Sequence, residues 1–458
     1  MPTLDRIATA SDSRTDTTPV VSGIRSPKRA TRAADDSRAR WFPYYAGFSA
    51  GFVEDTIDQL DLKSGAVLLD PWLGAGTTSE VATAKGSQIR GYDLNPAMLL
   101  VARARLLATE TADDVATLVK RTCDTYERRV LRPETPTKSG FDDPLEQWLQ
   151  PASARAFRIV ERCVAAAVSN NSPSSARPIW KNIGKMAPIE AFLYVGLFRT
   201  LRHFISRFQS SNPTWVKVSE GNPRIQLSRQ RIYNRFLNEI TLMQDALSSE
   251  TRVMPSVGKR RCTITQASSM KLPLASNSVD VVLSSPPYCT RIDYVRATLP
   301  ELAVICFPNG ESIRRMREQM IGTPTISKES HDHDRAWGPT CNRFLSKVET
   351  HSSKASSTYY IKYYRQYFAK AFASLREIDR VLNDSGQCVL VVQDSYYKEV
   401  PNDLPTIYGE MAREIGWNLK HKIDFPVTRT LAGINPRVKQ YRNDFQAVES
   451  ALIFQKKV

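Results

Sequence analysis

The pattern of hydrophobic and polar positions predicts two blocks of alternating strands and helices. In the first block, a short apolar run ("AVLLD") precedes a glycine-rich turn and a helix, and a second strand ending "IRGYD" precedes another helix. Alternation of this kind is typical of a parallel sheet covered by helices. We therefore predict an α/β fold for this part of the chain.

The second block begins near residue 259 and shows the same alternation. The segments "VDVVLS", "QCVLVVQDS" and "ESALIFQKK" predict strands, and "YYRQYFAKAFASLREIDRVL" and "LPTIYGEMAREIGW" predict helices. Within this block, residues 296–357 are polar and show no clear period, which predicts an irregular insertion. Residues 109–258, which separate the two blocks, have apolar stripes typical of buried helix faces.

These blocks predict one α/β unit, made of residues 41–108 and 259–458, that is split by a helical insertion over residues 109–258. Residues 1–40 have almost no apolar periodicity and several Arg and Lys residues. Segments of this composition cannot bury enough apolar surface to fold by themselves. We expect a disordered basic tail there.

The excess of basic residues indicates which class of partner the protein could bind. Lys and Arg number 63 against 47 Asp and Glu, so the formal net charge is +16. This excess favours nucleic acid or an anionic membrane surface as a partner, although a solvated basic surface without a partner is the alternative. No apolar run approaches the ~18 residues of a membrane span, so we expect no membrane partner.

Cysteine and histidine usage indicates a cytoplasmic protein without a structural metal. The seven cysteines include no CxxC pair, which argues against a disulfide framework or a zinc ribbon and suits a reducing cytoplasm. His331 and His333 lack a third ligand cluster, so we interpret them as part of a polar loop and expect no metal.

The stretch "LLDPWLGAGTT" is the first that carries chemistry. A buried strand ends at Asp70, and Gly74 and Gly76 in the following turn permit close approach of a ligand to the backbone. A helix beginning near Thr77 would offer free N–H groups. Because Ser79 takes the place of the third glycine of G-x-G-x-x-G, the dinucleotide fingerprint is not met, which argues against NAD or FAD.

A second acidic turn follows the next predicted strand. Asp93 lies 23 residues after Asp70, at a place where a carboxylate can accept hydrogen bonds from both ribose hydroxyls of an adenosine ligand. Either aspartate alone could simply cap the following helix. The two turns together favour a nucleoside ligand.

The third informative stretch, "VDVVLSSPPY", begins as a buried strand and ends in a rigid polar corner from Ser285 to Tyr288. Two consecutive prolines remove two backbone donors and stiffen the chain. By itself the corner could be a stiff turn with its tyrosine in the core.

Together, "DPWLGAGTT", "GYDLNP" and "SSPPY" resemble the cofactor-binding, ribose-binding and catalytic motifs of S-adenosylmethionine-dependent DNA amino-methyltransferases, and "YYAGFSAGF" resembles a further cofactor motif of this family. Family members methylate N4 of cytosine or N6 of adenine. The resemblance covers residues 41–108 and 259–458. It implies a Rossmann-like class I methyltransferase sheet with helices on both faces, and target recognition within the insertion.

The resemblance also implies S-adenosylmethionine as cofactor and double-stranded DNA as substrate, and it leaves open whether a companion restriction or defence protein exists. We nominate the Ser285 oxygen and the Pro286 carbonyl as acceptors for the N–H bonds of the base amine, because they favour positive charge on the attacking nitrogen. Tyr288 would hold the extruded base. The expected catalytic residues are Ser285, Pro286, Pro287 and Tyr288, and the expected cofactor contacts are Asp70, Pro71, Gly74, Gly76, Thr77, Thr78, Asp93, Asn95, Ser268 and Phe48.

Two residues, one in the catalytic motif and one that departs from the family pattern, bear on function. Serine before Pro-Pro-Tyr resembles the cytosine-N4 enzymes, whereas Asp or Asn is commoner in adenine-N6 enzymes, so we predict cytosine N4. Ser268 stands where the family commonly has an acidic residue that contacts the adenine amine, and its hydroxyl can accept a hydrogen bond without charge. The alternatives are an adenine-N6 DNA methyltransferase, an RNA amino-methyltransferase and a non-catalytic cofactor- or DNA-binding module.

Two basic stretches are candidates for contacts with DNA. The segment "SNPTWVKVSEGNPRIQLSRQRIYNRF" combines basic residues with Trp215 and Tyr233, and it fits a solvated helix face and a nucleic-acid surface equally well. The late segment "RTLAGINPRVKQYRND" could contact phosphates or be an exposed loop without a partner. The candidate residues are Lys217, Arg229, Arg231, Arg437 and Lys439.

Overall fold

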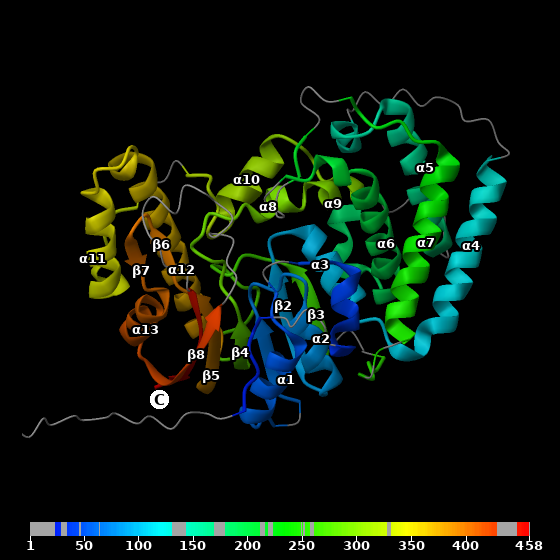
Figure 1. The fold of residues 1–458 in the computed structure, drawn as a ribbon. Coiled ribbons are helices and arrows are strands. Elements are labelled where there is room, and N and C mark those ends of the chain that lie inside the picture. Colours follow the sequence, from blue (N-terminus) through cyan, green and yellow to red (C-terminus); the bar gives the residue numbers. More distant parts are fainter. Residues whose placement is uncertain are drawn as a thin grey trace, which may run out of the picture.

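The computed structural model describes residues 23–28, 34–44, 47–63, 65–130, 143–168, 179–210, 216–218, 223–248, 250, 252–256, 261–327, 331–427 and 447–457. Its centre is a seven-stranded sheet of order β3-β2-β1-β4-β5-β9-β8 (Figure 1). The strands are β1 Val67–Asp70, β2 Gln88–Asp93, β3 Cys262–Gln266, β4 Val279–Ser284, β5 Leu382–Gln393, β8 Trp417–Val427 and β9 Ala447–Lys456. A separate hairpin pairs β6 Ser395–Tyr397 with β7 Val400–Asn402.

The first five strands of the sheet run parallel, and their carboxyl ends meet at one edge. β1 pairs with β2 on one side and with β4 on the other, although β4 lies about two hundred residues further along the chain. The strand order therefore reverses direction between β1 and β4. Ligands of open α/β sheets bind outside the carboxyl ends of the strands at such a point.

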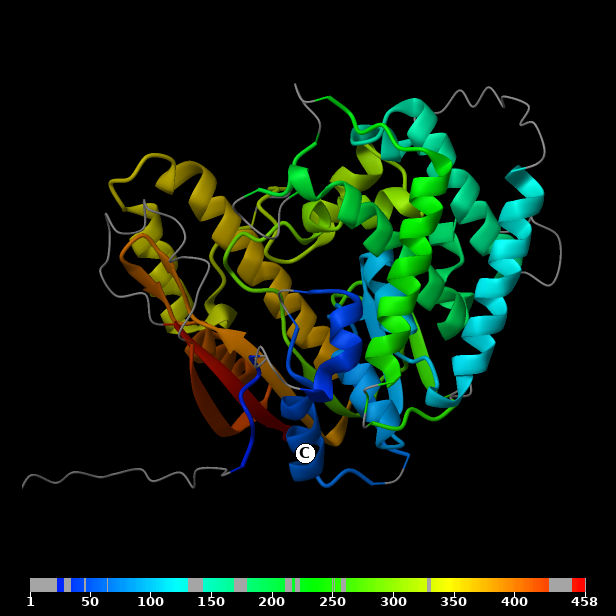
Figure 2. The same cartoon turned by 45° about the vertical axis from the view of Figure 1, so that its right-hand side comes forward.

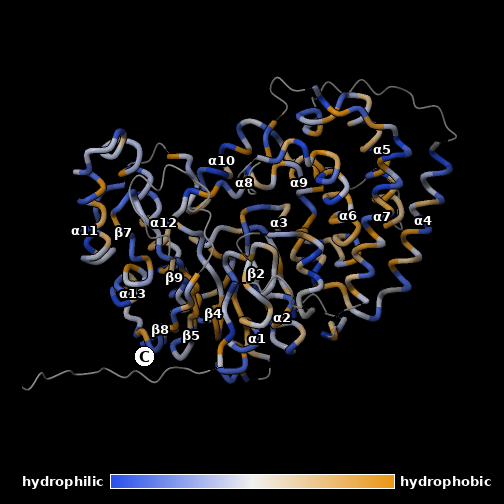
Figure 3. Tube along the Cα trace, viewed as in Figure 1, coloured by the Kyte–Doolittle hydropathy of each residue, from blue (hydrophilic) through white to orange (hydrophobic). Residues whose placement is uncertain are grey.

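Helices cover both faces of the sheet, because successive side chains of each strand point to opposite faces. Leu68 and Val281 pack on one face with helices α1 Ala50–Gln59 and α2 Thr77–Ala84. Leu69 and Val282 pack on the other face with α12 Ile361–Val381 and α13 Leu404–Glu414. Figure 3 shows hydrophobic positions, in orange, on the strands and also along the helices. The predicted α/β fold with helices on both faces is confirmed.

A group of helices lies beside the β3 edge of the sheet, between α3 and β3 in the chain (Figure 2). Its core includes a close stack of Tyr126 on Tyr233, with ring centroids 3.8 Å apart. The helices of this group follow α3 Pro96–Ala104 and are α4 Ala112–Val130, α5 Pro151–Val168, α6 Pro188–Phe204 and α7 Arg229–Ser248, with the short turns η2 Thr109–Thr111, η3 Pro144–Gln147, η4 Ile179–Lys181, η5 Ile183–Lys185 and η6 Ser206–Phe208. No helix within the described ranges is long and apolar enough to cross a membrane.

The segment predicted to be irregular contains helices, which corrects the expectation for residues 296–357. They are α8 Tyr294–Ala297, α9 Leu299–Val304, α10 Glu311–Gln319, η7 Arg335–Trp337, α11 Gly338–Glu349 and the π-helical turn η8 Ser356–Tyr360. The exposed helix α10 is held by ion pairs along its own surface, such as those of Arg314 with Glu311 and Glu318. Pairs of this kind leave almost no apolar period, so the sequence pattern did not reveal the helix.

Two parts of the expected tail are fixed to the sheet and its helices, which corrects the prediction for them. Arg25 pairs with Asp55 and Glu54 of α1. In η1, Ala34–Trp41, the buried Arg38 guanidinium pairs with Glu250 and donates to two backbone carbonyls. The partners lie far away in sequence, so composition alone could not indicate these contacts. The remaining tail positions lie outside the described residues.

Candidate active site

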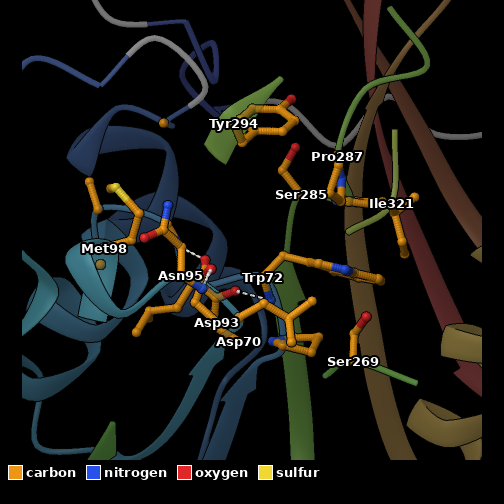
Figure 4. Close-up of a pocket in the computed structure, with 18 of the residues that line it drawn as sticks. Asp70, Trp72, Asp93, Asn95, Met98, Ser269, Ser285, Pro287, Tyr294 and Ile321 are labelled. Carbon is orange, nitrogen blue, oxygen red and sulfur yellow. Dashed lines mark hydrogen bonds between the residues drawn. The ribbon is translucent and has the colours of Figure 1, made fainter. Parts of the chain in front are cut away.

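A cleft lies at the carboxyl ends of β1, β2 and β4, where the strand order reverses. The space within it, including the part that is open to solvent, is about 930 Å³. In Figure 4, Ser285 and Pro287 face Asp93 and Asn95 across this space. The predicted residues that line it are Phe48, Asp70, Pro71, Gly74, Gly76, Thr77, Thr78, Asp93, Asn95, Ser285, Pro286, Pro287 and Tyr288.

Asp70, the last residue of β1, is a buried carboxylate held by two donors. The Ser284 hydroxyl donates to Oδ1 at 2.5 Å and the Trp72 backbone N–H donates to the same oxygen at 3.2 Å. Burial raises the pKa of Asp70 to about 6, although the hydrogen bond from Ser284 acts in the opposite direction. The residue therefore changes charge close to neutral pH.

The glycine turn brings the backbone close to the cleft. Gly74 and Gly76 have φ of +49° and +79°, which favour glycine. A Cβ at Gly76 would lie 2.6 Å from the Ala102 Cβ, so the turn also packs closely against α3. Helix α2 begins directly after this turn, and its first N–H groups have no partner within the helix. The turn and the helix start together favour a ligand with anionic or hydroxyl groups.

Asp93, the last residue of β2, is oriented by the backbone around it. Its Oδ2 accepts from the Gly74 N–H at 2.9 Å and its Oδ1 accepts from the Asn95 N–H at 2.8 Å. Burial raises the pKa of Asp93. A carboxylate has about four acceptor positions, and the backbone groups of Gly74, Leu94 and Asn95 do not use all of them, so Asp93 can still accept from a ligand hydroxyl. The residues present therefore fit the ribose of a nucleoside.

The Ser-Pro-Pro-Tyr corner presents acceptors in a fixed direction. The Ser285 hydroxyl donates to the Val391 carbonyl at 2.9 Å, which leaves its lone pairs able to accept. The Pro287 carbonyl accepts from the Tyr367 hydroxyl at 2.8 Å. Within the described part of the chain, no hydrogen bond to the Pro286 carbonyl is found. The Pro287 carbonyl thus anchors the corner, and the Pro286 carbonyl is available to accept a hydrogen bond from a ligand.

Tyr288 lines the cleft and its ring is nearly buried, with 8% of the residue exposed. Its hydroxyl donates to the Glu449 carboxylate. The following residue, Cys289, points into the apolar core, where burial raises the pKa of its thiol. A neutral, buried thiol is a poor nucleophile, so this cysteine offers no route to covalent catalysis.

One predicted cofactor contact lies elsewhere. Ala267 and Ser269 line the cleft, whereas Ser268 is not among its described lining residues. The chain turns directly after β3, where the Lys271 N–H donates to the Ser268 carbonyl at 3.0 Å. The Ser268 hydroxyl accepts from the Met270 N–H at 3.3 Å. The turn therefore brings the neighbouring serine to the cleft in its place, a difference of one position that a motif alignment cannot resolve.

Several lining residues were missed by the sequence analysis. Trp72 lies inside the first motif and Tyr44 inside the aromatic motif, so their motifs could have indicated both. Met320 and Ile321 follow α10 and carry no signal in the sequence. Tyr294 was not missed: its place shortly after the Ser-Pro-Pro-Tyr corner made it a candidate for the rim of the site, and it lines the cleft above Ser285 in Figure 4.

The candidate DNA contacts that the structure describes do not line the cleft. Lys217 and Arg231 are exposed, and Arg229 is half-buried at the start of α7. Tyr233 is buried in its stack on Tyr126, so it is not available to stack on a base, which removes one ring from the proposed surface. Trp215, Arg437 and Lys439 lie outside the described residues.

Comparison with known proteins identifies relatives over much of the chain. M.BsoBI, a type II methyltransferase of Geobacillus stearothermophilus, is 24% identical over 303 residues, which cover 63% of this chain and 56% of that protein. This chain is similar to type II methyltransferases. M.AvaI, named a type II methyltransferase in Nostoc sp. and in Anabaena variabilis, is 20% identical over 409 residues, covering 84% of this chain and 80% of that protein. No family model matches the chain.

These relatives confirm the resemblance that the three motifs predicted. The alignment with M.BsoBI spans little more than half of that protein's length. The methyltransferase similarity extends through the insertion in the longer alignments, since 409 residues exceed the length of the two α/β blocks.

Proposed function

We propose that this protein is a site-specific DNA methyltransferase that transfers a methyl group from S-adenosylmethionine to the exocyclic amine of a flipped base in duplex DNA, with cytosine N4 preferred. The observation that carries the proposal is the shared cleft: the acceptors Ser285 and Pro286 line the same space as Asp70 and Asp93. The relatives named type II methyltransferases support it.

The cleft residues fit this cofactor. Asp93 can still accept from the ribose hydroxyls, and the turn at Gly74 and Gly76 allows the ligand close to the backbone. Asp70, when ionised, favours a positively charged ligand. When bound, S-adenosylmethionine supplies an electrophilic methyl group on a positively charged sulfur.

The chain's own contribution to catalysis lies in the corner. The amine of cytosine or adenine is a weak nucleophile, because its lone pair is delocalised into the ring. Ser285 and the Pro286 carbonyl would accept hydrogen bonds from its two N–H groups and stabilise the positive charge that develops on nitrogen. The hydrogen bonds from Ser285 to Val391 and from Tyr367 to Pro287 hold these acceptors in place, so little reorganisation is required.

The target base must leave the duplex to reach this corner, at a cost of a few kcal/mol. Tyr288 offers an aromatic face in the cleft for the extruded base. The net charge of +16 favours the phosphate backbone that the protein would have to contact. Lys217, Arg229 and Arg231, in the helical insertion, remain proposed DNA contacts, as do Arg437 and Lys439, and the insertion remains the proposed target-recognition region.

The preference for cytosine N4 rests on Ser285. A serine, which is an uncharged acceptor, stands before Pro-Pro-Tyr here, as in the cytosine-N4 enzymes that the motif resembles. The test is to incubate the protein with cofactor and duplex DNA, digest the product and identify the methylated nucleosides by mass spectrometry. N4-methylcytosine is expected. N6-methyladenine alone would overturn the preference and leave the DNA methyltransferase standing.

The same transfer assay with RNA as substrate, together with calorimetry of cofactor binding, separates the other candidate functions. Methyl transfer to RNA but not to DNA would indicate the RNA amino-methyltransferase. Absence of transfer together with absence of cofactor binding by calorimetry at millimolar concentration would indicate the non-catalytic module. Because the relatives are named type II methyltransferases, we further propose a restriction-modification setting with a companion restriction or defence protein.

A further inference from the structure

A buried carboxylate contacts the proposed base-binding tyrosine. Glu449 accepts a hydrogen bond from the Tyr288 hydroxyl through Oε1 and is only 1% exposed. Its second oxygen, Oε2, makes no hydrogen bond within the described part of the chain. Burial of an ionised carboxylate is costly unless a partner compensates it. Glu449 therefore depends on the groups that contact it at this buried position.

The antiparallel direction of β9 brings Glu449 to the cleft. β9 begins where the parallel strand β5 ends, and Glu449 pairs in register with Gln393, the last residue of β5. The adjacent backbone is fixed, because the Val448 N–H donates to the Asp394 carboxylate at 3.0 Å and the Asp394 N–H donates to the Val448 carbonyl at 3.1 Å. Glu449 thus stands on a rigid support at the edge that carries the site.

A cation from the amino-terminal segment completes the arrangement. The Lys28 ammonium lies 3.4 Å from Oε1 of Glu449 and 5.4 Å from the centroid of the Tyr288 ring. The segment is anchored to the start of α1, since Ser49 donates through its N–H to the Pro27 carbonyl at 2.7 Å and through its hydroxyl to the Ser26 carbonyl at 2.9 Å. Lys28 is therefore held close to both partners.

We propose that Glu449 is a positioning residue that sets the orientation of the Tyr288 ring for the extruded base, and that Lys28 is its counter-ion. The proposal rests on the proposed function. A tyrosine ring turns about two side-chain torsions, and the hydrogen bond from the Tyr288 hydroxyl to Glu449 restricts the first of them, because it fixes where the far end of the ring lies. Burial raises the pKa of the Tyr288 hydroxyl well above its ordinary value, so it keeps the proton that it donates. Preorganised contacts of this kind reduce the ordering required when the substrate binds.

The test compares Glu449→Ala, Glu449→Gln and Tyr288→Phe with the matched control Ser450→Ala. Ser450 is the next residue of β9, is equally buried and bonds Asp424 instead of Tyr288. For each variant, kcat and KM are measured on duplex DNA, the cofactor Kd is measured by calorimetry, and folding is checked by thermal unfolding.

We expect Glu449→Ala to lower kcat by about 10- to 100-fold while the cofactor Kd changes by less than about twofold. Glu449→Gln should restore most of the rate, because its amide oxygen can still accept from Tyr288. The double variant Tyr288→Phe/Glu449→Ala should be no slower than the slower single variant, since both remove the same hydrogen bond. Lys28→Met should lower kcat in the protein that retains Glu449. In the Glu449→Gln variant, adding Lys28→Met should not lower kcat further.

Three results would overturn the positioning role while leaving the proposed function intact: rates of Glu449→Ala equal to those of Ser450→Ala, multiplicative effects of Tyr288→Phe and Glu449→Ala, or a cofactor Kd that weakens in parallel with kcat. If Glu449→Ala does not fold, Glu449→Gln and the Lys28→Met pair decide the question. Absence of methyl transfer by the wild-type protein would overturn the proposed function, and the positioning role with it.

Discussion

Ser284 donates a hydrogen bond of 2.5 Å to Asp70, joining two residues that lie 214 positions apart. Ser284 is the last residue of β4 and immediately precedes Ser285, whereas Asp70 is the last residue of β1 and precedes the turn that contains Gly74 and Gly76. The bond connects the proposed catalytic corner directly to the proposed cofactor site. The charge of Asp70 therefore depends on a residue of the catalytic strand.

The first prediction concerns the pH dependence of cofactor binding. Burial raises the pKa of Asp70 to about 6, so its negative charge should be lost as the pH falls through that value. Affinity for S-adenosylmethionine, measured by calorimetry from about pH 5 to about pH 8, which covers both sides of the transition, should weaken on the acid side. Ser284→Ala removes a donor that stabilises the charge, so the transition should move to higher pH.

The control for this prediction is S-adenosylhomocysteine, whose sulfur is uncharged. Its affinity should change less over the same range, and Asp70→Asn should abolish the difference between the two ligands. A pH profile of Asp70→Asn that matches the wild type would assign the transition to another group.

The second prediction concerns the free energy of unfolding. Because the pKa of Asp70 is higher in the folded protein (about 6) than its ordinary value of 3.8, the folded state binds the proton more tightly. The contribution of Asp70 to stability should therefore be fully present below its unfolded pKa of 3.8. As the pH rises through the folded pKa, this contribution should be lost, which lowers the free energy of unfolding by up to about 3 kcal/mol.

Urea unfolding of wild type and Asp70→Asn at pH 4 and pH 7 measures this effect. The difference in stability between the two proteins should change in favour of Asp70→Asn as the pH rises. An unchanged difference would contradict the raised pKa.

The third prediction separates chemistry from binding. Ser285→Ala removes an acceptor that is used chiefly as positive charge develops on the amine, so kcat should fall by about 100-fold. The cofactor Kd should change by less than about twofold, since the Ser285 hydroxyl donates to Val391 and not to the glycine turn. Single-turnover rates with calorimetry check both quantities. Equal losses in rate and cofactor affinity would indicate a structural role.

The fourth prediction uses two glycines with nearly the same backbone conformation. Gly76 and Gly86 have φ of +79° and +82°, so alanine at either costs about 1–2 kcal/mol of strain. A Cβ at Gly76 would also lie 2.6 Å from the Ala102 Cβ, whereas a Cβ at Gly86 would have no atom within 4 Å.

Gly76→Ala should therefore lower the free energy of unfolding by about 1–3 kcal/mol more than Gly86→Ala. Urea denaturation compares the two variants with the wild type. If both lose the same amount, the contact between the turn and α3 can relax, and the close packing that we describe is not required.

The elements that could be predicted from sequence are those determined by local patterns. The first motif predicts a strand, a turn and a helix start because two glycines follow an apolar run, and the structure has them at β1 and α2. Helix α10 could not be predicted because ion pairs such as that of Arg314 with Glu318 replace an apolar period. Tyr233 looked like a surface ring because nothing in the sequence indicated its partner, Tyr126.

The site shows the same division. Asp70, Asp93 and the corner from Ser285 to Tyr288 could be nominated because each ends an apolar strand. The choice of Ser269 over Ser268 depended on how the chain turns after β3. Glu449 was missed because it lies within a strand and carries no motif.

By itself, the sequence determined the α/β class, the three motifs and the chemistry that they resemble, because these follow from periodicity, turn-forming residues and side-chain types over short stretches. The tertiary structure decided which residues meet. Parallel pairing of β1 with β4 places Asp70 beside Ser284, and the antiparallel direction of β9 brings Glu449 to Tyr288. Strand register and direction depend on packing between segments hundreds of residues apart, and no local pattern contains that information.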